Sequence, residues 1–148
     1  MFKKILVPID GGQPSEAAIK GACAFARDSG AKLIFYHAKP GYCPAYVSGE
    51  MVMADPGINE AFMSAMDKQA KALLAAAAQT ATDMGVECEI LSTECDMPYE
   101  GIIAAAEGQA CDLIFMASHG RRGVSALLLG SETQRVLTHG KIPVLVYR

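Results

Sequence analysis

Residues 111–134 read CDLIFMASHGRRGVSALLLGSETQ, and they join a strand signal to a helix start. Residues 111–117 are almost continuously apolar, which is typical of a strand that is covered on both faces. Gly130 and Ser131 come directly before the helical pattern SETQRVLTHG. Ser131 suits the N-cap position, and Gln134 three residues later completes a capping box. The stretch therefore predicts a buried strand, a loop, and a helix whose first N–H groups can bind an anion.

Strand and helix signals alternate along the rest of the chain. Short apolar runs predict strands at residues 3–9, 31–38, 86–92, 111–117 and 142–148. Helical periodicity predicts helices at residues 14–29, 59–84, 98–110 and 131–140. We expect Ser15 or Asp10 to cap the first helix. The alternation predicts an α/β protein with a parallel sheet between two layers of helices, joined by right-handed crossovers.

The composition is that of an ordinary globular protein. The chain has 148 residues, of which 51% are hydrophobic and 20% charged, so we expect one domain over residues 1–148. The net charge of −3 gives no reason to expect nucleic acid or a membrane as a partner. No apolar run approaches the roughly 18 residues of a membrane-spanning helix, and MFKKILVPID reads as a first strand, not a signal peptide. The five cysteines are scattered without a C-x-x-C pair, which favours reduced thiols. We therefore expect a cytoplasmic protein.

Ligands of such sheets bind beyond the carboxyl ends of the strands. The segments at those ends are residues 8–10, 37–38 and 116–120. Beside them, the helix start at residues 130–131 and the arginines at 121–122 could bind phosphate. The alternative is a loop that only begins a helix and carries solvated arginines. No lysine follows the glycine at 130, so the stretch is not a Walker loop.

Two segments, VPIDGGQPSEAAI at residues 7–19 and SHGRRGVSALLLGSETQRVLTHGKIPVLVYR at residues 118–148, resemble the universal stress protein family. The resemblance extends over essentially the whole chain. It implies a Rossmann-like fold, similar to that of adenine nucleotide alpha hydrolases, with a five-stranded parallel sheet in the order 3-2-1-4-5. It also implies a homodimer and, in many members, ATP bound through the motif G-x2-G-x9-G-[S/T].

The resemblance assigns roles to individual residues. Gly120, Gly130 and Ser131 match the last three fixed positions of the motif. Asp10 matches the acid expected near the ribose, and Ala38 matches the position whose backbone contacts the adenine. Three positions would lie near the phosphates: Arg121, Glu132 and Thr133. The full implied nucleotide site is Pro8, Ile9, Asp10, Ala38, Met116, Ala117, Gly120, Arg121, Gly130, Ser131, Glu132 and Thr133.

Two residues depart from the family pattern. Ala117 replaces the first glycine of the motif. If the backbone there is left-handed, or if the ligand packs against the Cα atom, the methyl group of alanine would weaken binding by roughly 1–2 kcal/mol. If the backbone is extended, the methyl group would have a negligible effect. Glu132, in the first turn of the last helix, suits the helix dipole but competes with phosphate for the same N–H groups. Both departures favour an alternative in which the protein binds no nucleotide and acts only through protein contacts.

Other chemical sites have weaker support. Asp10 could share a magnesium or manganese ion with the phosphates of ATP, or it could only hydrogen-bond to loop amides. His37 and His119 should both lie near strand ends, where they could form a metal site with Asp10. Ser118 and His119 resemble a nucleophile and a base, but adjacent residues on an extended chain point to opposite sides. We therefore predict no metal held by the protein alone and no dedicated catalysis, with slow ATP hydrolysis as an incidental activity.

Two surfaces are candidates for protein contacts. Val144, Leu145 and Val146 should form an apolar, unprotected sheet edge, which predicts a two-fold dimer through the last strand. The long loop at residues 39–57 is either a lid or surface for a regulatory protein partner, or a poorly ordered insertion. The sequence thus predicts a cytoplasmic, dimeric, ATP-binding stress-response protein. The remaining alternative is a small hydrolase or nucleotidyl transferase on the same fold.

Overall fold

The computed structural model describes residues 1–41, 46–47, 50–51, 56–119 and 129–148. The strands are β1 (Lys4–Pro8), β2 (Lys32–Lys39), β3 (Tyr46–Val47), β4 (Glu50–Met51), β5 (Cys88–Glu94), β6 (Leu113–Ala117) and β7 (Val144–Tyr147). The helices are α1 (Gln13–Ser29), α2 (Pro56–Asp83), α3 (Pro98–Gly108) and α4 (Ser131–His139). All the predicted elements are present, and their ends differ from the predictions by up to three residues.

The main sheet has five parallel strands in the order β5-β2-β1-β6-β7. This is the predicted order 3-2-1-4-5, because the short antiparallel pair β3-β4 lies outside the main sheet. The strand order reverses between β1 and β6, which is the point where ligands bind on sheets of this kind. Their carboxyl ends therefore define where a site is expected.

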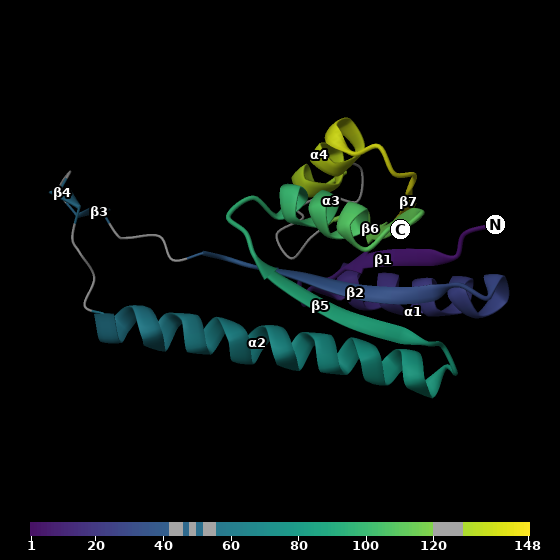
Figure 1. Ribbon diagram of the computed structural model, residues 1–148, viewed down its shortest axis with the longest axis horizontal. Coiled ribbons are helices and arrows are strands. Elements are labelled where there is room, and N and C mark those ends of the chain that lie inside the picture. The colour runs from purple at the N-terminus through teal and green to yellow at the C-terminus, as the bar shows by residue number, and fades with distance from the viewer. Residues whose placement is uncertain (42–45, 48–49, 52–55, 120–128) are drawn as a thin grey trace.

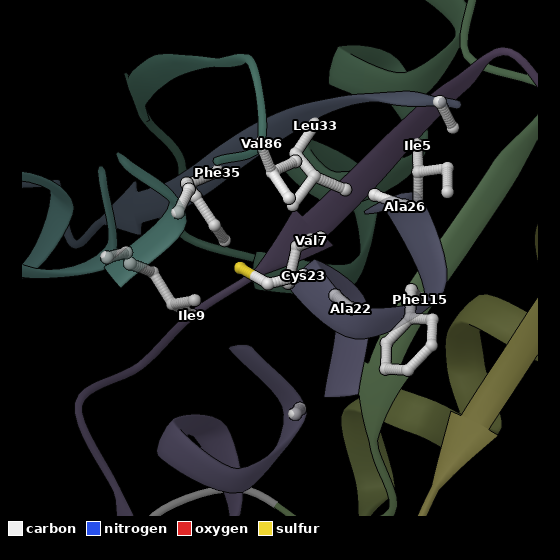
Figure 2. Close-up of a cluster of buried hydrophobic side chains, with 14 of the residues drawn as sticks. Ile5, Val7, Ile9, Ala22, Cys23, Ala26, Leu33, Phe35, Val86 and Phe115 are labelled. Atoms are coloured by element: carbon white, nitrogen blue, oxygen red, sulfur yellow. The ribbon is translucent and has the colours of Figure 1, made fainter. Parts of the chain in front are cut away.

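Helices cover both faces of the sheet (Figure 1). On one face, α1 and α2 pack against strand residues such as Val7, Leu33 and Phe35, while α1 contributes small side chains such as Ala22 (Figure 2). On the other face, α3 and α4 pack against the alternate strand residues, among them Ile34. Successive side chains of a strand point to opposite faces, so two covered faces require the continuous apolar runs seen in the sequence.

Both predicted helix caps are wrong. The N-cap of α1 is Gly12 and that of α4 is Gly130, and neither helix has a side-chain cap. Ser131 is the first helical residue instead. The Gln134 side chain donates to the carbonyl of Leu129 at 3.0 Å and closes no capping box. In both helices a glycine with an extended backbone is the N-cap. Ser15 and Ser131 therefore lie within the first turn, where their hydroxyls do not cap the helix.

Strand β7 forms one edge of the sheet, as predicted, and among the described strands it pairs with β6 alone. The side chains of Val144, Leu145 and Val146 are half-buried. The predicted loop is shorter than expected, because β2 continues to Lys39 and α2 begins at Pro56. Most of residues 40–55 lie outside the described part of the chain, so the proposed lid or partner surface stays a prediction.

Within the described residues, none of the helices is both long enough and apolar enough to span a membrane. Four of the cysteines fall in this part of the chain, and all four are free thiols. Burial raises the pKa of Cys23 to about 11, with the nearby Cys88 adding to the shift. Burial likewise raises the pKa of Cys111 to about 11. Because the thiolate is the reactive form, these two buried cysteines are poor nucleophiles.

Candidate functional site

A pocket of about 470 Å³ opens at the carboxyl ends of β1, β2 and β6, between the amino ends of α3 and α4. Ligand pockets commonly measure about 300–1,000 Å³, so this one is large enough for a small molecule. Its walls are formed by Pro8, Ile9, Asp10, Ser15, Tyr36, His37, Ala38, Pro98, Ile102, Met116, Ala117, His119, Gly130, Ser131, Glu132 and Thr133. The pocket lies where the strand order reverses, as the topology predicts.

The end of β1 is held by hydrogen bonds that shape the turn into α1. The carboxylate of Asp10 accepts from the amide of Gly12 at 3.0 Å, and the amide of Asp10 donates to the hydroxyl of Ser15 at 3.3 Å. Gly11 lies between them with a φ of 82°, and a Cβ there would meet Leu73 at 2.8 Å. A residue with a side chain would be strained in this backbone and crowded by α2. Asp10 is thus oriented by the turn, in agreement with the prediction that it bonds to loop amides.

His37 fixes the end of β1 from the neighbouring strand. Its Nδ1 atom lies 2.8 Å from the carbonyl oxygen of Ile9, and the amide of Ile9 donates to the carbonyl of Tyr36 at 2.9 Å. A carbonyl oxygen can only accept, so Nδ1 carries the proton and donates. In the neutral ring, Nε2 is then an acceptor. His37, a residue of the pocket wall, is therefore held in one orientation by the backbone of β1's end.

The end of β6 meets the start of α4 through two hydrogen bonds. The hydroxyl of Thr133 donates to the carbonyl of Ala117 at 3.1 Å, and the amide of Gly130 donates to the carbonyl of Ser118 at 2.8 Å. Ala117 is the last residue of β6, pairs with Tyr147 and has no positive φ. The methyl group of Ala117 therefore imposes no backbone strain, which removes one of the two costs expected from this departure.

Ser118 and His119 do not point to opposite sides, which corrects the geometric argument from the sequence. The hydroxyl oxygen of Ser118 lies 2.7 Å from Nδ1 of His119. The alternation of an extended chain ends with β6 at Ala117, so it no longer separates these two side chains. However, Ser118 is only 4% exposed, and the residues that line the pocket include His119 but not Ser118. The hydroxyl therefore orients the imidazole and is not presented to a ligand.

Glu132 connects the amino ends of α3 and α4. One carboxylate oxygen accepts from the amide of Tyr99, in the first turn of α3, at 2.8 Å. The other accepts from the guanidinium of Arg135 at 3.1 Å, and this guanidinium also lies over the Tyr99 ring. The carboxylate is therefore directed at the backbone of the neighbouring helix, an arrangement that the sequence did not predict.

Tyr36 forms part of the pocket wall and is almost fully buried. Its hydroxyl lies 2.6 Å from that of Thr93, and burial raises the pKa of the phenol, although the hydrogen bond between the two hydroxyls opposes the shift. Gly101 of α3 packs directly onto this hydroxyl, so an added Cβ would collide with it and crowd Cys95. The close approach explains a glycine inside a helix, where it otherwise costs up to about 1 kcal/mol.

The structure brings ten of the twelve predicted site residues around this one pocket. Gly120 and Arg121 lie outside the described residues. The sequence did not indicate Pro98 and Ile102, which come from α3. The topology could have done so, because crossover helices of a parallel sheet begin at the carboxyl ends of its strands. That the twelve predicted residues bind a nucleotide stays a prediction.

The metal site considered from the sequence, with ligands His37, His119 and Asp10, is not formed. In the described part of the chain, no group of three or more histidine, cysteine, aspartate or glutamate side chains could hold an ion. The site suggested by His37, His119 and Asp10 is therefore not formed by these residues. Fold and pocket together define a doubly wound α/β protein with a ligand-sized pocket at the carboxyl edge of its sheet.

The chain belongs to the universal stress protein family. The sequence profile of that family matches residues 1–148. A universal stress protein of Thermus aquaticus is 33% identical over 148 residues, and the match covers 100% of both chains. The universal stress protein MJ0577 of Methanocaldococcus jannaschii is 26% identical over 156 residues, covering 100% of this chain and 96% of its own.

Solved structures share the fold. The structure of MJ0577 has a TM-score of 0.82 to this chain, with 27% identity over 99% of this chain and 95% of the other. The universal stress protein of Archaeoglobus fulgidus, solved in complex with dAMP, has a TM-score of 0.70 and 19% identity, covering 99% of this chain and 98% of its own. These neighbours agree with the Rossmann-like architecture and strand order described above.

Proposed function

We propose that this universal stress protein binds an adenine nucleotide in the pocket at the carboxyl ends of β1, β2 and β6. One observation carries the proposal: ten residues implied by the family resemblance, from four separate parts of the sequence, line the same pocket. The first turn of α4 lies at one side of the pocket, where its amides and the positive end of the helix dipole favour an anion. The A. fulgidus protein, solved with dAMP, supports the view that this fold holds adenine nucleotides.

ATP is the nucleotide that the resemblance implies. With ATP bound, Asp10 could share a magnesium or manganese ion with the phosphates. We propose binding without dedicated catalysis, because Ser118, the serine whose hydroxyl bonds to His119, is only 4% exposed and is not among the residues that line the pocket. Slow hydrolysis of ATP would be incidental.

We further propose that the protein is a cytoplasmic homodimer. A regulatory protein partner would distinguish its nucleotide-bound form from its nucleotide-free form. None of the strands in the described residues pairs with the outer edge of β7, and exposed sheet edges of this kind readily pair with a second chain. Symmetric pairing of β7 with its copy would give a two-fold dimer. Sedimentation analysis of the wild type and of Leu145→Lys tests this, with the variant expected to be monomeric.

Nucleotide binding is tested on purified protein in two ways. Denatured protein is examined by mass spectrometry for a co-purified adenine nucleotide, and AMP and Mg-ATP are titrated while the melting temperature is recorded. A ligand at 100 times its dissociation constant stabilises the folded state by about 2.7 kcal/mol. Absence of both a nucleotide and a shift would support the alternative, a universal stress protein that acts only through protein contacts.

A matched pair of variants places binding in this pocket. Ser131→Asp adds a carboxylate at an exposed residue that lines the pocket, where it suits the start of α4 and should not destabilise the fold. Ser64→Asp makes the same change on the exposed surface of α2, outside this pocket. We expect Ser131→Asp to weaken AMP and ATP binding and Ser64→Asp to leave it unchanged.

A further inference from the structure

The sheet has a second open edge, formed by β5 on the side away from β7 (Figure 1). β5 is seven residues long, and among the described strands it pairs with β2 alone. Near its middle, the side chain of Ile90 is 52% exposed. An edge strand of this length presents a row of backbone groups to which another strand can bond.

The backbone groups of β5 point alternately towards β2 and away from it. The amide of Leu33 donates to the carbonyl of Glu87 at 3.0 Å, and the amide of Cys95 donates to the carbonyl of Lys39 at 2.9 Å. The odd-numbered residues of this segment therefore face β2, and the residues between them face outwards. The outward-facing residues of the strand are Cys88, Ile90, Ser92 and Glu94. No other described strand pairs with their amides and carbonyls.

The side chains beside this edge are acidic on one face of the sheet and apolar on the other. Glu87 and Glu89 are exposed, and both pair with the ammonium of Lys32 at 2.8 Å. Glu94 is exposed at the carboxyl end of the strand. These three carboxylates and one ammonium give the edge a formal charge of −2. On the face opposite Glu87 and Glu89, Cys88 packs against the core and Ile90 extends this apolar surface to the solvent.

The net negative charge selects among possible partner strands. Opposite charges on neighbouring strands stabilise their pairing, and like charges destabilise it. A second copy of β5 would bring the same carboxylates to the shared edge, and an acidic segment would be repelled in the same way. Charged side chains commonly protect edge strands from self-association by this mechanism. A basic segment, in contrast, is attracted.

We propose that the outer edge of β5 binds an extended basic segment of another protein, which joins the sheet as an added strand. The segment alternates lysine or arginine, placed beside Glu87 and Glu89, with aliphatic residues placed beside Ile90. Main-chain hydrogen bonds to the outward-facing groups provide affinity, and the alternating side chains provide specificity. No residue of β5 lines the pocket, so this binding does not depend on a nucleotide.

The first test is a titration with a synthetic seven-residue peptide, which matches the length of β5. The peptide alternates lysine with valine, begins and ends with lysine, and carries a dye whose fluorescence anisotropy is recorded as the full-length protein is added. One control peptide has the same residues with the three valines adjacent, and another has glutamate in place of lysine. We expect the alternating peptide to bind several-fold more tightly than the first control and the glutamate peptide not to bind.

A matched pair of variants isolates the contribution of one outward-facing amide. Ile90→Pro removes this amide, and because Ile90 faces away from β2, no hydrogen bond to β2 is lost. Ile90→Ala truncates the same side chain and keeps the amide. We expect Ile90→Pro to bind the alternating peptide about fivefold more weakly than Ile90→Ala does, as the loss of one hydrogen bond implies. Glu89→Gln, which removes one carboxylate, should weaken binding several-fold, and melting curves establish that each variant is folded.

Amide hydrogen exchange, followed by NMR on the wild type, gives a second readout that needs no variant. In the free protein the amides of Glu89 and Leu91, which face β2, should exchange slowly, and those of Ile90 and Ser92 should exchange rapidly. The alternating peptide should slow the exchange of Ile90 and Ser92. This pattern would identify an added strand at this edge, because a peptide held only by charge forms no bonds to these amides.

Three outcomes overturn the proposal. If the peptide binds without slowing the exchange of Ile90 and Ser92, or if the control with adjacent valines binds equally well, the contact is electrostatic attraction and no strand is added. If Glu89→Gln binds as tightly as the wild type, the carboxylates do not select the partner. If the alternating peptide does not bind at all, the edge is closed to basic strands. None of these results affects nucleotide binding in the pocket, which is measured separately.

Discussion

The two ends of the sheet use their charged residues in different ways. At the amino end, the Asp112 carboxylate accepts from the amides of Lys3 and Lys4 at 2.9–3.1 Å. Beside it, Lys32 forms ion pairs of 2.8 Å with Glu87 and Glu89. These side chains form hydrogen bonds and ion pairs with neighbouring strands, and the contacts reach as far as β5 at the edge of the sheet. Charge at this end is used for structure.

At the carboxyl end, polar groups surround a hollow. Asp10, His37 and His119 are oriented by loop and strand atoms, and Glu132 is held from the neighbouring helix, yet all four line the pocket. In a doubly wound sheet the helix starts collect at this end, so their amides and dipoles face the pocket. The same residue types therefore build the scaffold at one end of the sheet and line a pocket at the other.

The largest effect is expected where the carboxyl end is most tightly packed. In Gly101→Ala the added methyl group collides with the Tyr36 hydroxyl, which is pinned by Thr93. We expect a loss of about 1–3 kcal/mol of unfolding free energy, measured by urea denaturation, together with weaker nucleotide binding. Gly108→Ala is the control in the same helix, because the Cβ there meets no described atom within 4 Å. If Gly101→Ala were as stable as Gly108→Ala, then Tyr36 and Cys95 would be able to move aside for the methyl group at little cost, and the prediction would be wrong.

A smaller effect is expected at the amino end. Asp112→Asn keeps an acceptor for the amides of Lys3 and Lys4 but removes the charge, which should cost about 1 kcal/mol at neutral pH. Nucleotide binding at the other end should be unchanged. If AMP affinity fell as strongly as in Ser131→Asp, the functional separation of the two ends would be refuted.

The effect of Asp112→Asn on the unfolding free energy should depend on pH. Burial of Asp112 alone would raise the pKa of its carboxyl, but the hydrogen bonds from the amides of Lys4 and Lys3 outweigh it, so the pKa lies below its usual value. A lowered pKa stabilises the fold above the unfolded-state value of about 3.9, and this stabilisation is lost as the pH falls through the folded-state pKa. The difference in unfolding free energy between wild type and Asp112→Asn should therefore close below about pH 4.

The smallest effect concerns the residue that departs from the family motif. Ala117 lies in the extended β6 and packs against the core, so Ala117→Gly should cost about 0.5–1 kcal/mol through added backbone freedom. AMP affinity, measured by calorimetry, should not improve. A clear gain in affinity would instead show that the ligand packs against the Cα atom of this residue.

The sequence predicted the scaffold well because its signals are local. The alternation of apolar runs with helical patterns indicated a parallel sheet between helices, and the family resemblance implied the strand order that the structure has. Local reasoning was less successful at the helix starts. Ser15 and Ser131 resemble caps, but the extended glycines before each helix take that position. Propensity identifies the right segment, whereas the backbone decides which residue of it is the N-cap.

The sequence was enough to predict the element types and the position of the pocket at the carboxyl ends of the strands, since these follow from periodicity and topology, and the family resemblance implied ten of its lining residues. Tertiary structure alone decided how those residues are paired. Glu132 and Tyr99 are 33 positions apart, and the hydrogen bond between them depends on two crossover helices beginning at the same end of the sheet. The Ile9 carbonyl meets the His37 ring because β1 and β2 lie side by side in register. Hydrogen bonds act over about 3 Å, so partners distant in sequence are selected only when the chain has folded.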